Sequence, residues 1–189
     1  MRRLPPGPHG LPPELVERNQ RERLVAAMAE VCAERGYAES SVAEVAKRAG
    51  VSTASFYRQF KDKRECMLVS FEELFGRLLA GLEGGCGETE DPGERARTGT
   101  ATAIALLTAD PPAARLLSIE IVAVGPEGVQ AQHNAIERLA NLLRGAEAPD
   151  DIPDPTWAAT AAMTALLARR LAEGRIPVAA EFEPLLEVL

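Results

Sequence analysis

The run of residues 40–63 limits the fold of this chain more than any other stretch. It reads SSVAEVAKRAGVSTASFYRQFKDK and contains two short helical patterns separated by one glycine. Ser41 and Glu44 have the spacing of a capping box, in which the serine hydroxyl and the glutamate carboxylate each accept a backbone N–H at a helix start. Gly50 stands where a helix end needs a left-handed residue. The spacing therefore predicts two helices joined by a tight corner.

The second helix is predicted from Thr53 to about Phe60, with Ser52 as its cap and Phe56 facing inward. In a helix-turn-helix unit the second helix enters the major groove of DNA, where hydroxyls and cations contact phosphates and polar side chains read base edges. The alternative is that corners of this kind in small helical domains bind nothing. The candidate DNA contacts, with Lys63 expected on a phosphate, are Ser41, Ser52, Thr53, Ala54, Ser55, Tyr57, Arg58, Gln59 and Lys63.

The same run resembles the DNA-binding domain of the tetracycline-repressor (TetR) family of bacterial transcription regulators. The residues that carry the resemblance are Ser41-Val42, Val45-Ala46, Ala49-Gly50-Val51-Ser52, Phe56-Tyr57, Phe60 and Lys63, with Gly36-Tyr37 upstream. Gln59 departs from the pattern, because many members have histidine there, so the contact it makes is expected to differ. The resemblance implies a homodimeric repressor that binds a palindromic double-stranded operator and is released by a small molecule. Beyond about residue 80 it supports only the layout of helices.

The charge of the chain is divided unevenly between its two ends. Residues 1–64 hold 12 Lys and Arg against 8 Asp and Glu, whereas residues 65–189 hold 9 against 20. A basic end on an acidic body concentrates the attraction for phosphate at one place and repels DNA from the rest. Acidic helix faces are also ordinary solubilising surface. The net charge of −7 is thus compatible with DNA binding.

Several classes of protein are disfavoured by the sequence. No apolar run is long enough to span a bilayer, and the N-terminal arginines precede prolines and glycines rather than the apolar segment of a signal peptide. Cys32, Cys66 and Cys86 are odd in number and lack metal-type spacing, which indicates free thiols in a reducing cytosol. We therefore expect a cytoplasmic protein with no membrane segment, no metal and no cofactor.

Proline and glycine punctuate the chain, aromatic residues make up only 4%, and no β alternation competes with helical spacing. We predict an all-α fold of about nine helices. The expected parts are a disordered arm at 1–13, a helix-turn-helix DNA-binding domain at 14–63 and a ligand-binding and dimerisation domain at 64–189. The expected helices are 14–35, 41–49, 53–60, 63–82, 92–108, 111–125, 126–144, 155–173 and 180–189.

The last two predicted helices, 155–173 and 180–189, carry apolar faces that something must cover. In the resembled family such helices pair with their symmetry mates, and a two-fold dimer supplies the second half-site on DNA. The alternative is that they pack on the core of their own monomer. The side chains expected near the centre of the dimer interface are Leu167, Leu171, Phe182 and Leu186.

Aliphatic side chains with few charges on the same faces predict a cavity in the C-terminal half. Such a cavity would bind a small, largely apolar effector, uncharged or weakly cationic, held by one or two polar groups. One alternative is a solid core with no cavity. Another is that Glu120 and His133 lie at the surface and do not line a pocket. The candidate pocket residues are Leu78, Ile104, Leu107, Thr108, Leu117, Glu120, Ile121, His133, Trp157 and Thr160, with Val129 and Ile136 as further aliphatic lining.

An enzyme is the competing class of function. Of the two histidines, His9 falls in the proline-rich arm and His133 lies between amide side chains. The sequence has no nucleophile elbow, glycine-rich phosphate loop or metal-ligand cluster, so we predict no catalytic residues. A third possibility is an architectural or protein-interaction helical module without a small-molecule ligand. Uniform binding to any DNA would favour that module, and sequence-specific binding would favour the regulator.

Overall fold

The computed structural model describes residues 12–85, 91–145, 155–175, 179–182 and 184 of the 189-residue chain. These residues form eight α-helices and two short 3-10 helices and contain no strand, so the all-α prediction is confirmed. The elements are α1 (Pro13–Arg35), α2 (Val42–Ala49), α3 (Thr53–Gln59), α4 (Lys63–Gly85), α5 (Pro92–Ala109), α6 (Pro111–Ser118), η1 (Glu120–Val124), α7 (Pro126–Arg144), α8 (Pro155–Ala172) and η2 (Ala179–Phe182).

The corner between α2 and α3 forms through the local contacts that the sequence predicts. The Ser41 hydroxyl accepts the Glu44 N–H at 3.3 Å, and the Glu44 carboxylate accepts the Ser41 N–H at 3.0 Å. Gly50 ends α2 in the left-handed region, with φ 65° and ψ 38°. The Ser52 hydroxyl then accepts the N–H of Ser55 at 3.0 Å and begins α3. Both helices therefore start, and α2 also ends, where capping chemistry requires.

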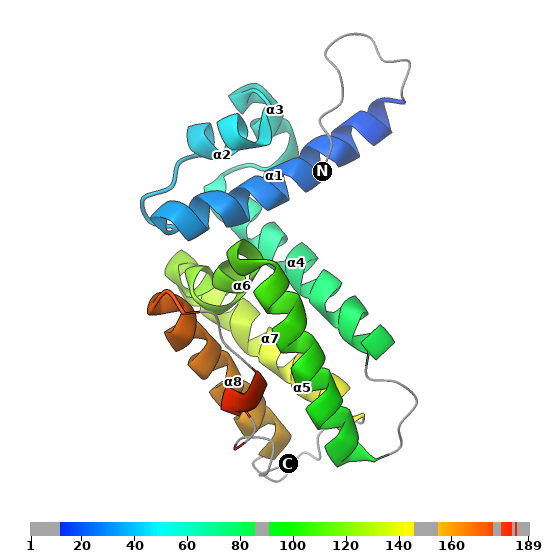
Figure 1. Cartoon of the computed structure of the whole chain (residues 1–189). Coiled ribbons are helices and arrows are strands. Elements are labelled where there is room, and N and C mark those ends of the chain that lie inside the picture. The colour runs from blue at the N-terminus through cyan, green and yellow to red at the C-terminus, as the bar shows by residue number, and fades with distance from the viewer. Residues whose placement is uncertain (1–11, 86–90, 146–154, 176–178, 183, 185–189) are drawn as a thin grey trace.

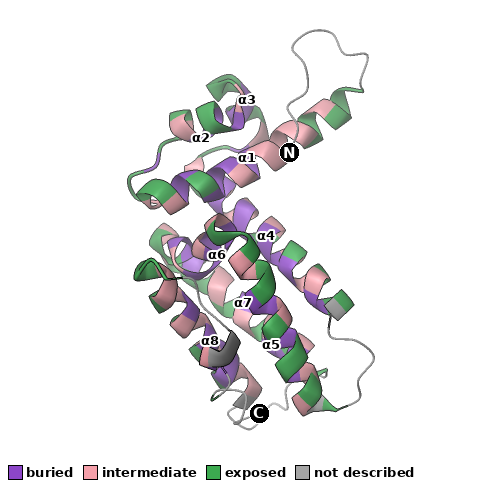
Figure 2. Cartoon of the chain, viewed as in Figure 1, coloured by how far each residue is buried: buried purple, intermediate pink, exposed green. Residues whose placement is uncertain are grey.

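Helix α1 lies between the helix-turn-helix unit and the helical bundle and packs against both. Its buried stripe includes Leu24, Met28 and Cys32, and it packs against α2, α4 and α6. Figure 1 shows α2 and α3 on one side of α1 and the bundle of α4 to α8 on the other. Buried residues line the inner faces of these helices in Figure 2, where α1, α2 and α4 meet. The helix-turn-helix unit thus shares its core with the first turns of α4.

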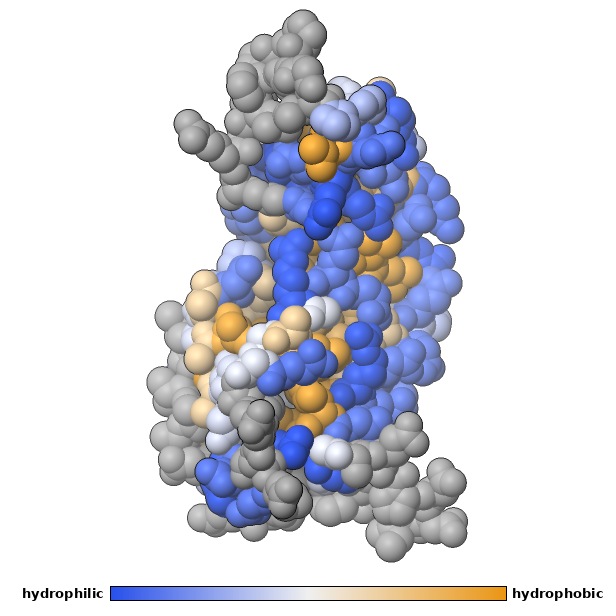
Figure 3. All heavy atoms as spheres, turned by 90° about the vertical axis from the view of Figure 1, so that its right-hand side faces the viewer, coloured by the Kyte–Doolittle hydropathy of each residue, from blue (hydrophilic) through white to orange (hydrophobic). Residues whose placement is uncertain are grey.

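The surface that Figure 3 turns to the viewer is largely hydrophilic, with apolar side chains gathered in small, separate patches. Patches of this size are ordinary on folded proteins, because polar atoms cannot cover the whole surface. None of the helices that the structure describes is long and apolar enough to cross a membrane.

The predicted helix at 111–125 is in fact two elements, which corrects the prediction. α6 ends at Ser118, Ile119 leaves the helical region with φ −121° and ψ −56°, and η1 continues as a 3-10 helix from Glu120. A close approach accompanies the break: a Cβ built on Gly128 of α7 would lie 1.9 Å from the Ile121 carbonyl oxygen. The backbone of η1 therefore sits directly against α7, which only a glycine at position 128 permits.

The predicted helix at 180–189 is described only in part. Residues 179–182 form the 3-10 helix η2 and residue 184 is helical, while residues 183 and 185–189, including Leu186, lie outside the described residues, as do residues 1–11. Leu167 and Phe182 are buried within this chain, in one cluster with Ile104, Leu143 and Met163. Leu171 packs against the same cluster. The expectation that Leu167 and Phe182 form an exposed dimer surface is therefore wrong, because the monomer already covers them.

Candidate nucleic-acid interface and ligand pocket

The outer face of α3 carries the exposed groups of the candidate DNA interface. Thr53, Ala54, Tyr57 and Arg58 are exposed, and Tyr57 keeps 57% of its surface accessible. Behind this face Phe56 is fully buried in the core. Its ring centroid lies 5.5 Å from that of Phe60, in a tilted arrangement. The helix therefore offers a hydroxyl, a phenol and a guanidinium on a rigid support.

Ser55 does not belong to the exposed face, contrary to the prediction. It is 8% exposed, and its hydroxyl lies 3.0 Å from the Ser52 hydroxyl. The same oxygen accepts a hydrogen bond from Arg58 Nη2 at 2.8 Å. Ser55 therefore orients the Arg58 guanidinium instead of facing the groove. Gln59 is half-buried, and the exposed Ser41 and Ser52 use their hydroxyls as caps.

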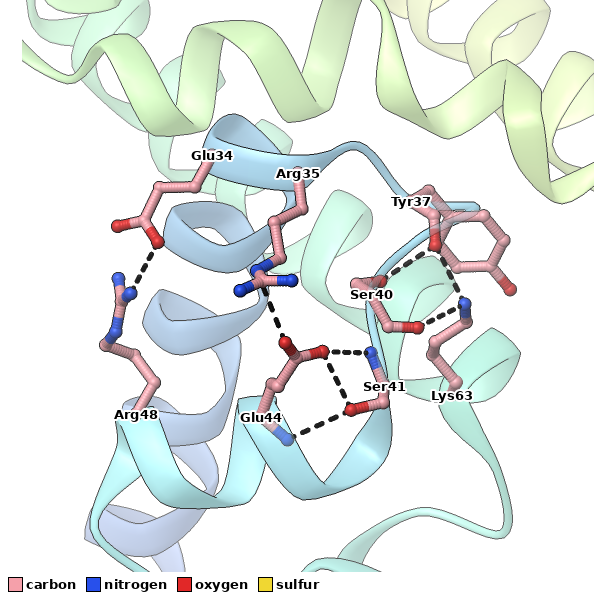
Figure 4. A network of polar contacts seen from close by, with 8 residues as sticks. All are labelled: Glu34, Arg35, Tyr37, Ser40, Ser41, Glu44, Arg48 and Lys63. Atoms are coloured by element: carbon pink, nitrogen blue, oxygen red, sulfur yellow. Dashed lines mark hydrogen bonds and ion pairs between the residues drawn. The ribbon is translucent and has the colours of Figure 1, made fainter.

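Lys63 is also placed differently from the prediction that it presents a cation to phosphate. Its ammonium donates to the carbonyl oxygens of Tyr37 at 2.7 Å and Ser40 at 2.8 Å, and lies 3.5 Å from that of Ala38. It also lies 4.3 Å from the centroid of the Tyr37 ring. Figure 4 shows the ammonium pointing between these groups. The side chain thus holds the connection between α1 and α2 and is not free to reach DNA in this geometry.

Other basic side chains of the helix-turn-helix unit are also held by partners. Figure 4 shows Arg48 in contact with Glu34 at 2.6 Å and Arg35 in contact with Glu44 at 3.2 Å. Arg48 also contacts Glu30 at 3.0 Å. The hydrogen bond from Arg48 lowers the pKa of Glu34, and the hydrogen bond from the Ser41 hydroxyl lowers the pKa of Glu44. The remaining exposed cations near α3 include Lys47 and Lys61. These two are the better candidates for phosphate contacts.

Two apolar cavities lie in the bundle of α4 to α8. One has a volume of about 60 Å³ and the other about 50 Å³. Both are half-open to solvent, and the surfaces that line them are mostly apolar, as in sites that bind apolar molecules. They share a wall made of Leu107, Leu139, Thr164 and Leu167. The bundle therefore contains two adjoining hollows instead of a solid core.

The first cavity is lined by residues of α4, α6 and α7, with α5 and α8 closing one wall. Leu78, Leu107 and Leu117 line it, as predicted, together with Phe71 and Phe75 from α4. Polar atoms reach it from Ser118, Gln132 and Thr164. These three were not among the predicted pocket groups, because nothing in helical spacing separates a polar side chain beside a cavity from one at the surface.

The second cavity is lined by Ile104, Leu107 and Thr160, which were also predicted, and by Met163 and Phe182. The Thr160 hydroxyl donates to the Thr156 carbonyl at 2.7 Å. Because that bond satisfies its proton, the hydroxyl offers an oxygen and no spare donor to a ligand. The cavity is thus almost wholly apolar.

Ile136, a further predicted lining residue, also lines the first cavity. The remaining predicted pocket residues line neither of these two cavities. Ile121 is fully buried in the main core, and the Thr108 hydroxyl donates to the Ile104 carbonyl at 2.8 Å. The His133 ring packs edge-on against Trp157 at 5.7 Å between centroids and contacts Glu137 at 3.2 Å. Val129 is 53% exposed. For His133 the surface alternative is the correct one.

Glu120 is neither a pocket group nor a surface group. It is 5% exposed, and its carboxylate accepts the backbone N–H of Tyr37 at 2.8 Å and Nε of Arg115 at 2.9 Å. These partners come from the segment after α1 and from α6. Sequence spacing offered no signal for this contact, because Tyr37 and Glu120 are far apart along the chain.

The two cysteines that the structure describes are buried free thiols. Burial raises the pKa of Cys32 to about 11 and that of Cys66 to about 12. Both therefore remain protonated near neutral pH and behave as small apolar side chains. Among the described residues, no group of three or more histidines, cysteines, aspartates or glutamates is placed to hold a metal ion.

The sequence of the helix-turn-helix segment matches a known protein family whose description agrees with this architecture. Residues 24–69 match the sequence model of "Bacterial regulatory proteins, tetR family", a segment that spans the end of α1, all of α2 and α3, and the start of α4. The match confirms the resemblance read from residues 40–63. Residues 24–69 are therefore similar in sequence to the tetR family of bacterial regulatory proteins.

Relatives and solved structures extend the similarity beyond that segment. The fatty acid metabolism regulator protein of Bacillus subtilis is 28% identical over 123 residues, which cover 65% of this chain and 63% of that protein's length. The fatty acid degradation regulator FadR from Bacillus halodurans superposes with a TM-score of 0.75 at 18% identity, over 89% of this chain and 93% of that one. FadR from Bacillus subtilis, solved in complex with stearoyl-CoA, gives a TM-score of 0.64 at 20% identity, over 88% and 96%. The fold is therefore that of these regulators.

Proposed function

We propose that this protein is a sequence-specific DNA-binding transcription regulator. It acts in the cytoplasm as a homodimer on a palindromic operator and is released from DNA by an apolar effector. The exposed face of α3 carries this proposal: Thr53, Tyr57 and Arg58 project from a helix whose opposite face is locked into the core. The match of residues 24–69 to the tetR family supports the same assignment. The relatives named above are regulators, which argues against an enzyme.

The effector is best described as a molecule with an extended hydrocarbon chain. The two cavities are apolar and adjoin through Leu107, Leu139 and Leu167, so rotation of these side chains would join them into one longer channel. Hydrocarbon chains gain about 0.8 kcal/mol for each buried CH₂ group. One structural relative was solved with stearoyl-CoA, whose acyl chain has this chemistry. An acyl compound is therefore the first class to test.

DNA binding and effector binding are assigned to different parts of the chain. We assign residues 14–63 to DNA binding and residues 64–189 to effector binding and dimerisation. α4 links the two, since Phe71, Phe75 and Leu78 line the first cavity while Lys63 at its start contacts the segment before α2. An effector that prefers one position of α4 would change DNA affinity by its difference in affinity for the two states.

The homodimer would use α7 and α8, because Leu167 and Phe182 are already buried. Ala158, Ala162 and Ala165 form an exposed face of α8 with no bulky side chain among them. Small side chains of this kind allow a neighbouring helix to approach closely. Two-fold pairing would place two copies of α3 on successive half-sites of one DNA face.

Selection of bound duplexes from a random DNA pool tests the proposal. We expect one inverted repeat to be enriched, with an affinity that falls steeply as salt is raised. Equal recovery of all sequences would instead assign the protein to the architectural class. A thermal-shift series with saturated fatty acids of increasing chain length and their CoA thioesters tests the effector. Compounds that raise the melting temperature should also lower affinity for the selected duplex.

A further inference from the structure

The short segment between α1 and α2, residues 36–40, is held from two directions by charged side chains. We name it the 36–40 loop. From η1, the Glu120 carboxylate accepts the Tyr37 N–H at 2.8 Å. From α4, the Lys63 ammonium donates to the carbonyl oxygens of Tyr37 and Ser40, at 2.7 and 2.8 Å. One peptide segment therefore has its donor bound by an anion and its acceptors bound by a cation.

These contacts are strong for physical reasons. Hydrogen bonds in which one partner is ionised are shorter and about twice as strong as neutral ones. Glu120 is 5% exposed, so its carboxylate would be costly to leave without partners, and Arg115 supplies the second one at 2.9 Å. The loop is followed directly by Ser41, which caps α2. The position of the loop thus sets where the helix-turn-helix corner begins.

We infer that Glu120 is a positioning residue that transmits the state of the first cavity to the recognition helix through the 36–40 loop, and that Lys63 is a second positioning residue that holds the same loop. The inference deepens the proposed function, since it names the contacts that would regulate the DNA-binding face. Neither residue touches DNA in this scheme. Each acts by holding the backbone from which α2 and α3 continue.

The path from the cavity to Glu120 is short. Ser118, the last residue of α6, lines the first cavity, and its carbonyl accepts a hydrogen bond from the Gln132 side chain at 3.2 Å. Gln132 lines the same cavity. Glu120 follows Ser118 by two residues, across the non-helical Ile119. A molecule that displaces Gln132 or Ser118 therefore moves the backbone that carries Glu120.

η1 cannot move away from the 36–40 loop, because α7 packs directly against its other side. Gly128 of α7 packs so closely against η1 that a Cβ there would lie 1.9 Å from the Ile121 carbonyl oxygen and 3.0 Å from the Val124 Cβ. η1 is thus confined between α7 and the 36–40 loop. Displacement at the cavity is directed toward the loop, because close-packed elements shift as units and do not deform continuously.

Amide hydrogen exchange of the free, full-length protein tests the inference without DNA or effector. Lys63→Met should speed exchange at amides 37–41 by about ten- to a hundredfold, the effect expected when charged hydrogen bonds are lost. Lys61→Met is the matched control, because Lys61 is an exposed neighbour whose side chain has no such role. If Lys63 serves only as a phosphate ligand, exchange in the free protein will be unchanged, which would overturn the inference.

Glu120→Ala should have the same effect at the Tyr37 amide, with Glu137→Ala, an exposed glutamate of α7, as its control. A double-mutant cycle then tests the link to the cavity. Gln132→Leu should speed exchange at Tyr37 in the wild-type background and add nothing when Glu120 is already alanine. Gln130→Leu, exposed on the same helix, should do neither. Independent, additive effects of Gln132→Leu and Glu120→Ala would refute transmission through Glu120.

The last readout uses the DNA duplex that the wild-type protein selects from a random pool. Glu120→Ala and Lys63→Met should each weaken binding to that duplex by about five- to thirtyfold, and Glu137→Ala should not. Faster exchange at the loop with unchanged DNA affinity would overturn the positioning role. If the wild-type protein selects no sequence, the proposed function fails, and the exchange cycle still decides whether the cavity and the loop are coupled.

Discussion

The close approach of α7 to η1 makes Gly128→Ala the most informative single change for the packing of this fold. A Cβ at this position would lie 1.9 Å from the Ile121 carbonyl oxygen and 3.0 Å from its carbonyl carbon. Carbon and oxygen atoms in contact normally keep about 3.3 Å apart. The two backbones must therefore separate by about 1.4 Å, and a backbone carbonyl cannot rotate away as a flexible side chain can.

The size of the effect follows from two opposing terms. Overpacking of this kind costs about 1–3 kcal/mol or somewhat more, because neighbouring elements must shift. Alanine in place of a helical glycine returns up to about 1 kcal/mol through its better helix propensity. For a chain of this size each kcal/mol changes Tm by roughly 2–4 °C. With the overpacking cost at its upper end of about 3 kcal/mol, the net loss is about 2 kcal/mol, and we expect Gly128→Ala to lower Tm by roughly 4–8 °C.

Thermal and urea unfolding of the variant, followed by circular dichroism, measures this loss. Gly76→Ala is the matched control, because Gly76 also lies within a helix but a Cβ added there would meet no atom within 4 Å. It should gain about 0.5–1 kcal/mol. If Gly128→Ala is as stable as Gly76→Ala, the contact between α7 and η1 is looser than described, and the confinement of η1 fails with it.

Three further changes have defined outcomes. Phe56→Ala should cost about 3–5 kcal/mol in urea unfolding, because it empties a fully buried site behind α3. Glu44→Gln should lower Tm at pH 7 by removing the carboxylate of the capping box. The hydrogen bond from the Ser41 hydroxyl lowers the pKa of Glu44 in the folded state below its ordinary value of 4.5. The stabilisation by the carboxylate is therefore present above pH 4.5 and is lost as the pH falls through the folded-state pKa. The Tm values of the wild type and the variant should converge in acid. Ala162→Arg should yield monomers in sedimentation at micromolar concentration, whereas Ala43→Arg, at an exposed alanine of α2, should not.

Local chemistry made much of the fold predictable. Both ends of α2 and the start of α3 follow from Ser41, Gly50 and Ser52, whose capping depends only on near neighbours in the chain. The starts of α5 to α8 follow from prolines at the first helical position, which each of these helices has. The break between α6 and η1 carried no such signal, since neither glycine nor proline marks Ile119. It is accompanied by the close approach of Gly128 to Ile121, a contact that helical spacing does not show.

The candidate site was predictable only in part, for the same reason. Helical spacing placed Phe56 inside and Tyr57 outside correctly. It could not show that Lys63 reaches the carbonyls of Tyr37 and Ser40, because that contact spans more than twenty residues. Nor could it show whether apolar faces at Leu167 or Phe182 meet another monomer or their own. A hydrophobic stripe identifies a buried surface and does not identify what buries it.

The affinity for the selected duplex relative to a scrambled duplex of equal length is the decisive measurement for sequence recognition by α3. At physiological salt we predict a ratio of at least about a thousandfold for the wild-type protein. Arg58→Ala and Tyr57→Ala should reduce that ratio, while Lys61→Ala should weaken both duplexes alike and flatten the dependence on salt. A ratio near one, or equal ratios for the wild type and both α3 variants, would contradict the assignment of α3 as the recognition helix.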